Sequence, residues 1–375
     1  AEILIKKGTN DLFITPGVGK IKGYSQVNGV PVYRLHSILN YLLDVLFSIS
    51  KKSTVKKTVI EYNDSLPHNT IDRRIGLGSR LRYLVFLINA YLFIKKRKSN
   101  ISILHCHTIE WPAYVAAKLS KWFKIKLIVK DSTMNGIFNI LRFPSGRKKQ
   151  ELIIRQSHFV AMTTIIKTNL LHAGVPENKI VMIPNGILLD DSCKNDYSGA
   201  ENVLFVGNLY QQPAKGVDIL IKAWKIVIMA VPQAKLSIAG DGNLSAYRQY
   251  VKEHNIQSSV IFLGKHNNVH ELMLNTDIFV LPSRREGMPN VLMEAMLTGV
   301  PCIGTSISGS QDLLEGGECG IIVPPSDIQQ LAGAIIYLLE KRDVAAVMGR
   351  NARKRIIASY NINDIADRYA NLYSK

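Results

Sequence analysis

Two glutamates, Glu286 and Glu294, stand eight residues apart in the segment 276–323. The apolar run Ile278–Leu281 predicts a strand before them, and Val291–Thr298 predicts a helix. Glu286 therefore falls in the loop before the helix, and Glu294 about one turn inside it. Open α/β sheets bind ligands at the carboxyl ends of their strands. One carboxylate would face the reacting end of a ligand and the other would accept hydrogen bonds from ribose hydroxyls, and this context disfavours the alternative of two ordinary solvated glutamates.

The turn between the two glutamates is suited to binding an anion. Pro289 fits a first helical position, because proline lacks the N–H that such a position leaves without a partner. The free amides of Asn290 and Val291 would then point at the anion, and the helix dipole would stabilise its charge. Gly287 and Met288 complete this loop. We therefore expect an anionic part of the ligand at this helix start.

A second segment, Val203–Leu209 followed by Lys215–Asp218, reads as a strand, a glycine turn and a lysine before a helix. Lys215 could place a cation on a diphosphate, and Gly207 would let the backbone approach it closely. Lys-Gly before a helix is common, so this segment is informative only together with the glutamate segment. A third glycine turn, Ala239–Gly242, ends another predicted strand, and its alternative interpretation is a simple tight connection.

Taken in order, these motifs resemble those of the retaining glycosyltransferases of family 4, which have the two-domain GT-B architecture. The resemblance covers most of the chain. Pro184–Ile187 matches the interdomain signature of that family, and Lys6–Pro16 and Val27–Arg34 match its early segments more loosely. The motifs that carry the resemblance are Val206–Leu209, Lys215–Asp218, Ala239–Gly242, Phe262–Gly264, Pro282–Gly287, the spacing of Glu286 and Glu294, and Glu294–Pro301.

The resemblance implies a role for each part of a donor site. Glu286 would lie near the transferred sugar, Glu294 would hold the ribose, and Lys215 would stabilise the leaving diphosphate. Glu286 and Lys215 would be the catalytic pair, and stabilisation of the leaving charge would need no metal and no cofactor. No Asp-x-Asp ligand motif occurs in a suitable loop. The expected donor-binding residues are Gly207, Asn208, Lys215, Gly264, Glu286, Gly287, Met288, Pro289, Asn290, Val291 and Glu294.

Three departures from the family pattern stand out. The family usually has arginine where this chain has Asn208, which removes a phosphate-binding cation for which Arg284 or Arg285 would compensate. Where the family often has a histidine near the sugar, the chain has Lys130–Thr133. The chain also begins without the strand and glycine-rich loop expected ahead of Ala1–Lys7, and we interpret it as an N-terminally truncated fragment.

Strands alternate with helices in both halves, which predicts right-handed βαβ units. We therefore expect an α/β fold of the GT-B type, with two Rossmann-like β/α/β domains facing across a cleft. The expected division is an acceptor-side domain over 1–186, a nucleotide-sugar donor domain over 187–355, and a helix over 356–375 that returns to the first domain. Ser132, Thr133 and Thr163 are the candidates for the acceptor side of the cleft.

The predicted elements can be stated by residue range. The predicted strands are Leu12–Thr15, Ile101–His105, Lys126–Val129, Phe159–Met162, Ile180–Ile183, Asn202–Val206, Lys235–Ala239, Val260–Leu263, Ile278–Leu281, Pro301–Gly304 and Gly320–Val323. The predicted helices are Ser79–Arg97, Pro112–Trp122, Lys167–Ala173, Val217–Val231, Leu244–His254, Val269–Asn275, Val291–Thr298, Ile328–Glu340 and Asn363–Tyr373.

The net charge of +18 lies entirely in the first half of the chain. Residues 1–190 hold 29 Lys and Arg against 11 Asp and Glu, whereas residues 191–375 hold 18 of each kind. Such a surface suits nucleic acid, an anionic membrane or an acidic substrate, and a generically basic solvated surface is the alternative. The predicted helix Ser79–Arg97 is apolar almost all round and leads into Lys95–Lys98, so it is either deeply packed or in contact with a membrane surface.

Length and composition limit the remaining possibilities. A chain of 375 residues suits two domains, and 47% hydrophobic residues indicate well-formed cores. The four cysteines are far apart, which argues against a zinc site or disulfides and fits a reducing cytosol. The longest uncharged apolar run, Tyr83–Ile94, is shorter than the roughly 20 residues of a spanning helix. His105 and His107 alternate along a strand end with no third metal ligand in view.

The residues and the resemblance together predict a retaining glycosyltransferase. It would move a sugar from a nucleotide-diphosphate sugar to a hydroxyl acceptor, a lipid-linked glycan or polysaccharide precursor, at the cytoplasmic face of the plasma membrane. The alternatives are a non-catalytic nucleotide-sugar or polyanion binder of the same fold, and a sugar-nucleotide epimerase or phosphorylase-like enzyme. Nucleic-acid binding is not expected, since no aromatic-interleaved basic motif or helix-turn-helix occurs.

Overall fold

The computed structural model describes residues 13–16, 23–27, 30–35, 77–109, 111–133, 135–194, 197, 201–211 and 213–374. The chain divides into two compact units, one of Ala1–Leu104 with Lys118–Lys126 and one of His105–Ala117 with Leu127–Lys375. The predicted features of Ala1–Lys7, and most of the motif Lys6–Pro16, lie outside the described residues.

The first unit contains a three-stranded sheet and one long helix. The strands lie in the order β1-β3-β2, with β1 parallel to β3 and β2 antiparallel to β3. The predicted strand at Leu12–Thr15 is shifted by one residue, whereas β2 and β3 were not predicted as strands. The elements are β1 (Phe13–Pro16), β2 (Gly23–Val27), β3 (Val30–Leu35), α3 (Leu77–Arg97) and the 3-10 turn η1 (Lys98–Asn100).

Helix α3 has two apolar faces, and only one of them is buried. Its buried side chains include Val85, Leu87, Ala90, Phe93 and Ile94. On the opposite side, Leu84, Ile88 and Leu92 recur every four residues and are 47%, 48% and 56% exposed. Core packing, one of the two alternatives predicted for this helix, therefore applies to one face, and contact with a membrane surface stays a prediction. Within the described residues, none of the helices has the length and hydropathy that crossing a bilayer would demand.

A four-stranded sheet of order β4-β5-β6-β7 follows, in which β5, β6 and β7 run parallel. All the predicted strands and helices of this region are confirmed to within three residues, but the short helix α5 and the helix α6, which is rich in charged residues, were not predicted. The elements are β4 (Ile103–Cys106), α4 (Trp111–Phe123), β5 (Lys126–Asp131), α5 (Gly136–Asn139), η2 (Ile140–Arg142), α6 (Gly146–Gln156), β6 (Ser157–Ala161), α7 (Thr164–His172), η3 (Glu177–Lys179) and β7 (Ile180–Met182).

A third sheet has six parallel strands in the order β10-β9-β8-β11-β12-β13. The predicted bounds of β8, β9, β11 and α13 match the structure residue for residue. The elements are β8 (Asn202–Val206), η4 (Leu209–Gln211), α8 (Val217–Ala230), β9 (Lys235–Ala239), α9 (Ser245–Glu253), β10 (Val260–Gly264), α10 (Val269–Leu274), β11 (Ile278–Leu281), α11 (Asn290–Leu297), β12 (Cys302–Thr305), α12 (Ser308–Leu314), η5 (Glu315–Gly317), β13 (Ile321–Val323) and α13 (Ile328–Glu340).

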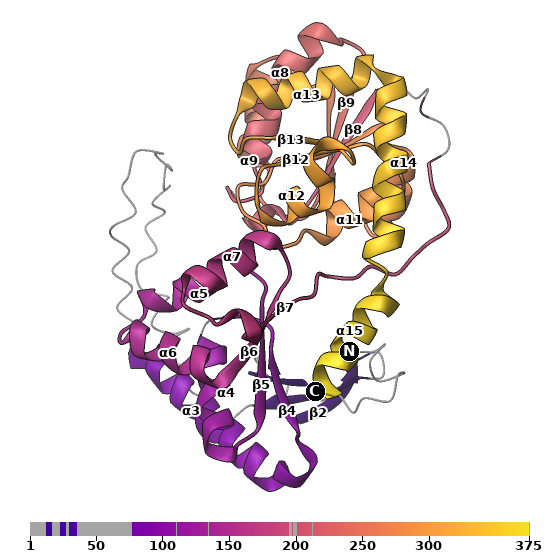
Figure 1. The fold of residues 1–375 in the computed structure, drawn as a ribbon. Coiled ribbons are helices and arrows are strands. Elements are labelled where there is room, and N and C mark those ends of the chain that lie inside the picture. The colour runs from indigo at the N-terminus through magenta and orange to yellow at the C-terminus, as the bar shows by residue number, and fades with distance from the viewer. Residues whose placement is uncertain are drawn as a thin grey trace. The chain divides into compact units, whose positions relative to one another are not determined.

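Helices cover both faces of this sheet (Figure 1), with α8 packed against α13 on one side and α11 packed against α14 on the other. The central strand β11 is buried along its whole length, as parallel strands with helices on both faces require. Two further helices, α14 (Arg342–Ser359) and α15 (Ile362–Ser374), end the chain. The predicted α/β class with two Rossmann-like sheets is confirmed, and the cleft between two domains stays a prediction.

The last helix covers the end of β4. Tyr369 of α15 is buried, and the Tyr373 hydroxyl lies 2.6 Å from Nδ1 of His105. The rings of His105 and His107 stack at 4.5 Å, and burial lowers the pKa of His105 to about 3. Both tyrosines thus pack the last helix against His105. Among the described residues there is no group of three or more His, Cys, Asp and Glu placed to hold a metal ion.

Candidate active site

The strand order of the six-stranded sheet has a reversal point at its centre. From β8 the chain moves outward through β9 and β10, and from the neighbouring strand β11 it moves the other way through β12 and β13. The crossovers on the two sides lie on opposite faces, and the carboxyl edge at such a reversal point is where open α/β sheets bind ligands. The loop 207–216 follows β8 and the loop 282–289 follows β11. These are the loops that carry the two motifs singled out in the sequence.

The structure brings Lys215 and Glu286 together at this point. The Lys215 Nζ atom lies 2.7 Å from Oε1 of Glu286, and the two side chains are 15% and 12% exposed. The Ser283 hydroxyl donates to the same oxygen at 2.8 Å. A cation and a carboxylate are thus held as one unit in a mostly buried place, where charge interactions are stronger than in water. Ser283 was not predicted, although it lies within the quoted motif Pro282–Gly287.

An arginine ties the two loops to each other. The Arg284 guanidinium donates to both carboxylate oxygens of Asp218 at 2.8 and 2.7 Å, and its backbone N–H donates to the carbonyl of Ala214 at 2.8 Å. Such a bidentate pair fixes orientation as well as distance. Arg284 therefore serves to position Lys215. The exposed Arg285 is then the remaining candidate to compensate for Asn208, which stands where the family usually has arginine. Asp218 had no predicted role, and this contact supplies one.

Gly216 is required where the Lys215 loop crosses the end of β11. Its φ is +68°, and a Cβ built on it would lie 2.0 Å from the carbonyl oxygen of Pro282. Both the left-handed backbone and the close approach exclude other residues. The glycine thus explains, in physical terms, why Lys-Gly stands at this turn. It lets the Lys215 backbone lie directly against the strand that leads to Glu286.

The remaining predicted turns lie along the same carboxyl edge. Gly207 follows β8, and its N–H donates to the carbonyl of Ala239 at 3.0 Å. A Cβ on Gly240 would lie 1.9 Å from the carbonyl oxygen of Gly207. The Asn208 side chain accepts from the N–H of Tyr210 at 3.0 Å and so shapes its own loop. Gly264 ends β10 with open space where a Cβ would be. This arrangement places the predicted donor-binding residues of three loops on one edge.

The start of α11 differs by one residue from the prediction. Pro289 is the residue before the helix and not its first residue, because α11 begins at Asn290. The N–H groups of Leu292 and Met293 both donate to the carbonyl of Pro289, at 3.2 and 3.3 Å. Helix geometry leaves the earlier amides, those of Asn290 and Val291, for a ligand.

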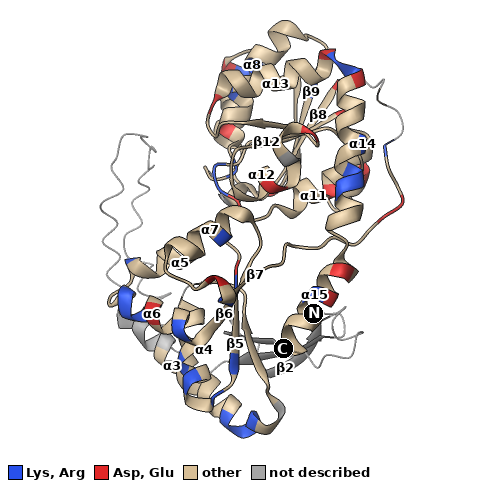
Figure 2. Ribbon diagram, in the orientation of Figure 1, with Lys and Arg blue, Asp and Glu red and all other residues tan. Residues whose placement is uncertain are grey.

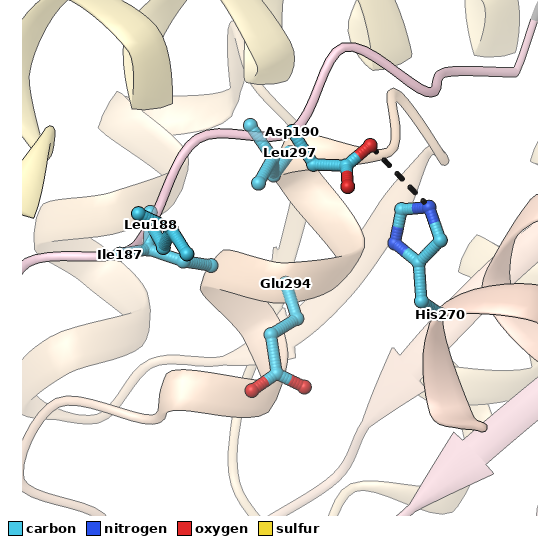
Figure 3. A pocket seen from close by; sticks show the side chains of 6 residues that line it. All are labelled: Ile187, Leu188, Asp190, His270, Glu294 and Leu297. Atoms are coloured by element: carbon cyan, nitrogen blue, oxygen red, sulfur yellow. Dashed lines mark ion pairs between the residues drawn. The ribbon is translucent and has the colours of Figure 1, made fainter. Parts of the chain in front are cut away.

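Glu294 lies one turn into α11 and borders a cavity of about 160 Å³. The other lining residues are Ile187, Leu188, Asp190, His270 and Leu297. Figure 3 shows the Glu294 carboxylate directed away from the ion pair of Asp190 and His270, whose closest atoms are 3.8 Å apart. Burial raises the pKa of the Glu294 carboxyl above its usual value. A hydroxyl-rich ligand that donates hydrogen bonds to the carboxylate would offset that cost.

The three acceptor-side candidates have different surroundings. A Cβ on Gly287 would lie 2.3 Å from the Ser132 carbonyl oxygen, so Ser132 lies directly against the residue after Glu286. Thr133 donates to Oδ1 of Asp131 through its N–H, at 3.2 Å. Thr163 is buried, begins α7 as its N-cap, and lies 2.6 Å from the Ser308 hydroxyl. Ser132 is therefore close to the Glu286 loop, whereas Thr163 has a packing role that the sequence did not indicate.

Comparisons with known proteins identify the family of this chain. The family model described as glycosyl transferases group 1 matches residues 200–341, and the model of glycosyltransferase family 4 matches residues 57–191. The N-acetyl-alpha-D-glucosaminyl L-malate synthase of Bacillus anthracis is 28% identical over 74% of this chain and 75% of its own length. The UDP-Gal:alpha-D-GlcNAc-diphosphoundecaprenol alpha-1,3-galactosyltransferase of Escherichia coli is 27% identical over 81% of this chain and 82% of its own length.

Solved structures show the same fold. The structure of Anabaena HepE with UDP has a TM-score of 0.68, 20% identity, and coverage of 77% of this chain and 82% of that one. Sucrose-phosphate synthase of Thermosynechococcus elongatus has a TM-score of 0.74, 19% identity, and coverage of 100% and 90%. The chain belongs to the family 4 glycosyltransferases of GT-B fold, and it is a glycosyltransferase.

Proposed function

We propose that this glycosyltransferase takes its sugar from a nucleotide-diphosphate sugar and passes it to a hydroxyl acceptor with retention of anomeric configuration. The observation that carries the proposal is the Lys215–Glu286 pair, held at the reversal point of the six-stranded sheet beside the start of α11. A cation, a carboxylate and two helix-start amides at one edge of the sheet match the needs of a departing diphosphate and the sugar attached to it.

In this proposal the donor diphosphate lies between Lys215 and the amides of Asn290 and Val291. As the bond from the anomeric carbon to the diphosphate breaks, negative charge grows on the leaving oxygen, and the Lys215 ammonium and the amides stabilise it. Glu286 faces the sugar, where positive charge develops at the anomeric carbon, and Glu294 accepts from the ribose hydroxyls. These groups meet the charges on both sides of the breaking bond, so the proposed mechanism uses no metal or cofactor.

A nucleotide-sugar donor is supported by the names of similar proteins. The Escherichia coli relative uses UDP-Gal, and Anabaena HepE has UDP in its structure. UDP sugars are therefore the first donors to test, with GDP and ADP sugars beside them. The proposal of retention comes from family membership, and front-face attack by the acceptor hydroxyl is the mechanism we assign to it.

Product analysis tests this chemistry. The protein is incubated with each donor and a panel of simple hydroxyl acceptors, and the released nucleoside diphosphate and new glycoside are measured by mass spectrometry. The anomeric coupling constant in the proton NMR spectrum then gives the configuration. An α-configured product from an α-configured donor, lost in Lys215→Met, is expected. A β-configured product would contradict retention, and an epimerised free nucleotide sugar would contradict glycosyl transfer by this site.

For the acceptor we propose a lipid-linked glycan or polysaccharide precursor at the cytoplasmic membrane face. The Escherichia coli relative acts on a sugar linked to diphosphoundecaprenol. Diphosphoundecaprenol is a lipid carrier with an anionic headgroup. The charge excess of the first half of this chain suits such a substrate and the surface that holds it. Figure 2 shows Lys and Arg on α3, α4 and α6, and the last of these contains Arg147, Lys148 and Lys149.

The surface that would meet the membrane is the exposed face of α3 with the end of α4. Leu84, Ile88 and Leu92 form the apolar stripe described above, and Trp122 of α4 is 52% exposed. Tyr91 joins the two helices, because its ring meets that of Trp122 edge to face at 5.6 Å. Aromatic and aliphatic side chains of this kind enter the interface of a bilayer.

Basic residues border the same surface. Lys95, Lys96 and Lys98 follow the stripe, and Lys121 and Lys124 lie on either side of Trp122. All five are exposed. Each lysine near an anionic bilayer contributes about 1 kcal/mol, so such a group would add materially to a modest apolar contact. The combination of apolar stripe and lysines favours an anionic membrane over a neutral one.

A further inference from the structure

The segment that follows β7 reaches the donor-binding turn through one side chain. Asn185 uses its amide nitrogen to donate to Oδ1 of Asn290 at 3.0 Å and to the carbonyl of Met288 at 3.4 Å. Its backbone N–H also donates to the sulfur of Met288 at 3.1 Å. A single residue thus contacts both neighbours of Pro289, which are the residues that set where α11 begins.

Lys130 determines which way the Asn185 amide points. The Lys130 Nζ atom donates to Oδ1 of Asn185 at 2.8 Å. An ammonium group has only hydrogens to offer, so it must face the oxygen of the amide and not its nitrogen. Burial lowers the pKa of Lys130 to about 8, which leaves the group mostly charged at neutral pH. The amide nitrogen is therefore directed at the turn, and a flipped amide would lose the lysine contact.

The backbone around Asn185 is fixed from the other side. The N–H of Ile187 donates to the carbonyl of Tyr360 at 2.8 Å, and the N–H of Ile362 donates to the carbonyl of Ile187 at 3.0 Å. Gly186 lies so close to α15 that a Cβ on it would be 2.7 Å from the Cα of Ile362. The junction of α14 and α15 thus holds the segment in place, and Asn185 acts from a rigid support.

We propose that Asn185, oriented by Lys130, is a positioning residue for the turn 288–290 and so for the amides of Asn290 and Val291. This inference rests on the proposed function, in which those amides bind the donor diphosphate. An anion-binding helix start works best when its amides already point at the ligand site, because no free energy is then spent on ordering them.

Two measurements test the proposal, and the first needs no ligand. Hydrogen exchange of the backbone, followed by mass spectrometry, reports the amides of Leu292 and Met293, which are bonded to the Pro289 carbonyl. Loss of the side-chain hydrogen bonds in Asn185→Ala should speed exchange in peptides covering 286–297 by about tenfold. This factor corresponds to a loss of roughly 1.4 kcal/mol of hydrogen bonding. Lys130→Met should give a smaller change in the same peptides.

The second measurement is the affinity for UDP by isothermal titration calorimetry. Asn185→Ala should weaken UDP binding by about tenfold, and the double variant with Lys130→Met should be no weaker, because both changes act through one amide. Where turnover is measurable, the donor KM should rise by a similar factor with kcat nearly unchanged. Gln249→Ala is the control, since the exposed Gln249 side chain donates to Glu253 within its own helix, α9, away from this turn.

The outcomes separate the inference from the function on which it rests. Unchanged exchange in 286–297 for both folded variants would overturn the positioning role, whatever UDP does. The variants could exchange faster while the wild-type protein binds none of the nucleotides. That result would support the positioning role and count against the donor site. If Asn185→Ala does not fold, Lys130→Met alone decides, since it leaves Asn185 and its backbone contacts in place.

Discussion

The ammonium of Lys215 lies 2.7 Å from the carboxylate of Glu286, although 71 residues separate them. The pairing follows from the neighbourhood of β8 and β11, because each residue stands in the loop after one of these strands. The lysine proposed to meet the leaving diphosphate is therefore already held by the carboxylate proposed to face the sugar. A donor that binds here must share the lysine with Glu286 or displace it.

Removal of the Lys215 charge should damage catalysis far more than folding. In Lys215→Met we expect kcat/KM to fall by about 10²–10³, the cost of losing one oriented charge-stabilising group. Glu286 would keep only its hydrogen bond from Ser283, so stability should fall by about 1–2 kcal/mol. Steady-state kinetics and urea unfolding measure the two effects. Lys222→Met, at an exposed position of α8, is the matched control and should change neither.

The Arg284–Asp218 pair should act on catalysis through Lys215. Arg284→Lys keeps the charge but loses the bidentate contact, and we expect kcat/KM to fall by about tenfold. Asp218→Asn should have a similar effect, and the double variant should be no worse than either alone, because both changes break one contact. Kinetics of the four proteins form a double-mutant cycle. Fully additive losses would show that the two residues act separately.

Asp131 should make the stability of the protein depend on pH. Its side chain is 1% exposed, and burial raises the pKa of its carboxyl to about 7. The folded protein thus keeps a proton that the unfolded chain releases near pH 4, so this contribution is complete below about pH 4 and is lost as the pH rises toward 7. The Asp131→Asn side chain keeps an oxygen that accepts the hydrogen bonds from Thr133, and it has no titratable group.

Asp131→Asn should therefore be more stable than wild type at pH 8, by roughly 2–4 kcal/mol, and equal to it near pH 4. Urea unfolding across this pH range measures the difference. Asp191→Asn, at an exposed position, is the control and should follow the wild-type curve. A stability difference that does not vary with pH would contradict the titration of Asp131.

The proposed membrane surface predicts lipid-selective binding. Wild-type protein should sediment with vesicles containing an anionic lipid and much less with vesicles of neutral lipid alone, and binding should weaken with salt. Ile88→Ser with Leu92→Ser should reduce binding by removing apolar contact, and Lys95→Gln with Lys96→Gln should reduce it by removing charge. Met229→Ser, at an apolar residue of α8 that is 79% exposed, is the control. Equal failure to bind both kinds of vesicle would contradict the proposed membrane surface.

Much of the six-stranded sheet follows from local sequence. The runs Asn202–Val206 and Ile278–Leu281 are apolar, short and bounded by turn residues, which is typical of parallel strands buried on both faces. Helices α12 and α14 were not predicted because they bury small residues. Gly309 and Ser310 in α12, and Gly349 in α14, give no apolar period although they are buried. Pattern analysis responds to large apolar side chains and not to close packing of small ones.

The sequence indicates candidate site residues one by one, but not the contacts between them. Lys215, Glu286 and Glu294 stand out by type, spacing and family resemblance, whereas their neighbours depend on strand order. No local pattern shows that β8 lies beside β11, so the pair Lys215–Glu286 and the tie Arg284–Asp218 could not be inferred. The same holds for Asn185, which contacts a turn more than 100 residues away.

Donor binding that depends on Glu294 is the central claim, and thermal unfolding with a panel of nucleotide sugars tests it most directly. Wild-type protein and Glu294→Ala are each heated with UDP, GDP and ADP sugars. Both proteins receive the same concentration of each sugar, about 100 times the dissociation constant of the wild-type protein. We predict that one nucleotide class raises the Tm of wild type by roughly 3–5 °C and that Glu294→Ala loses most of this shift. An equal shift in both proteins, or none with any nucleotide, would contradict the donor site proposed here.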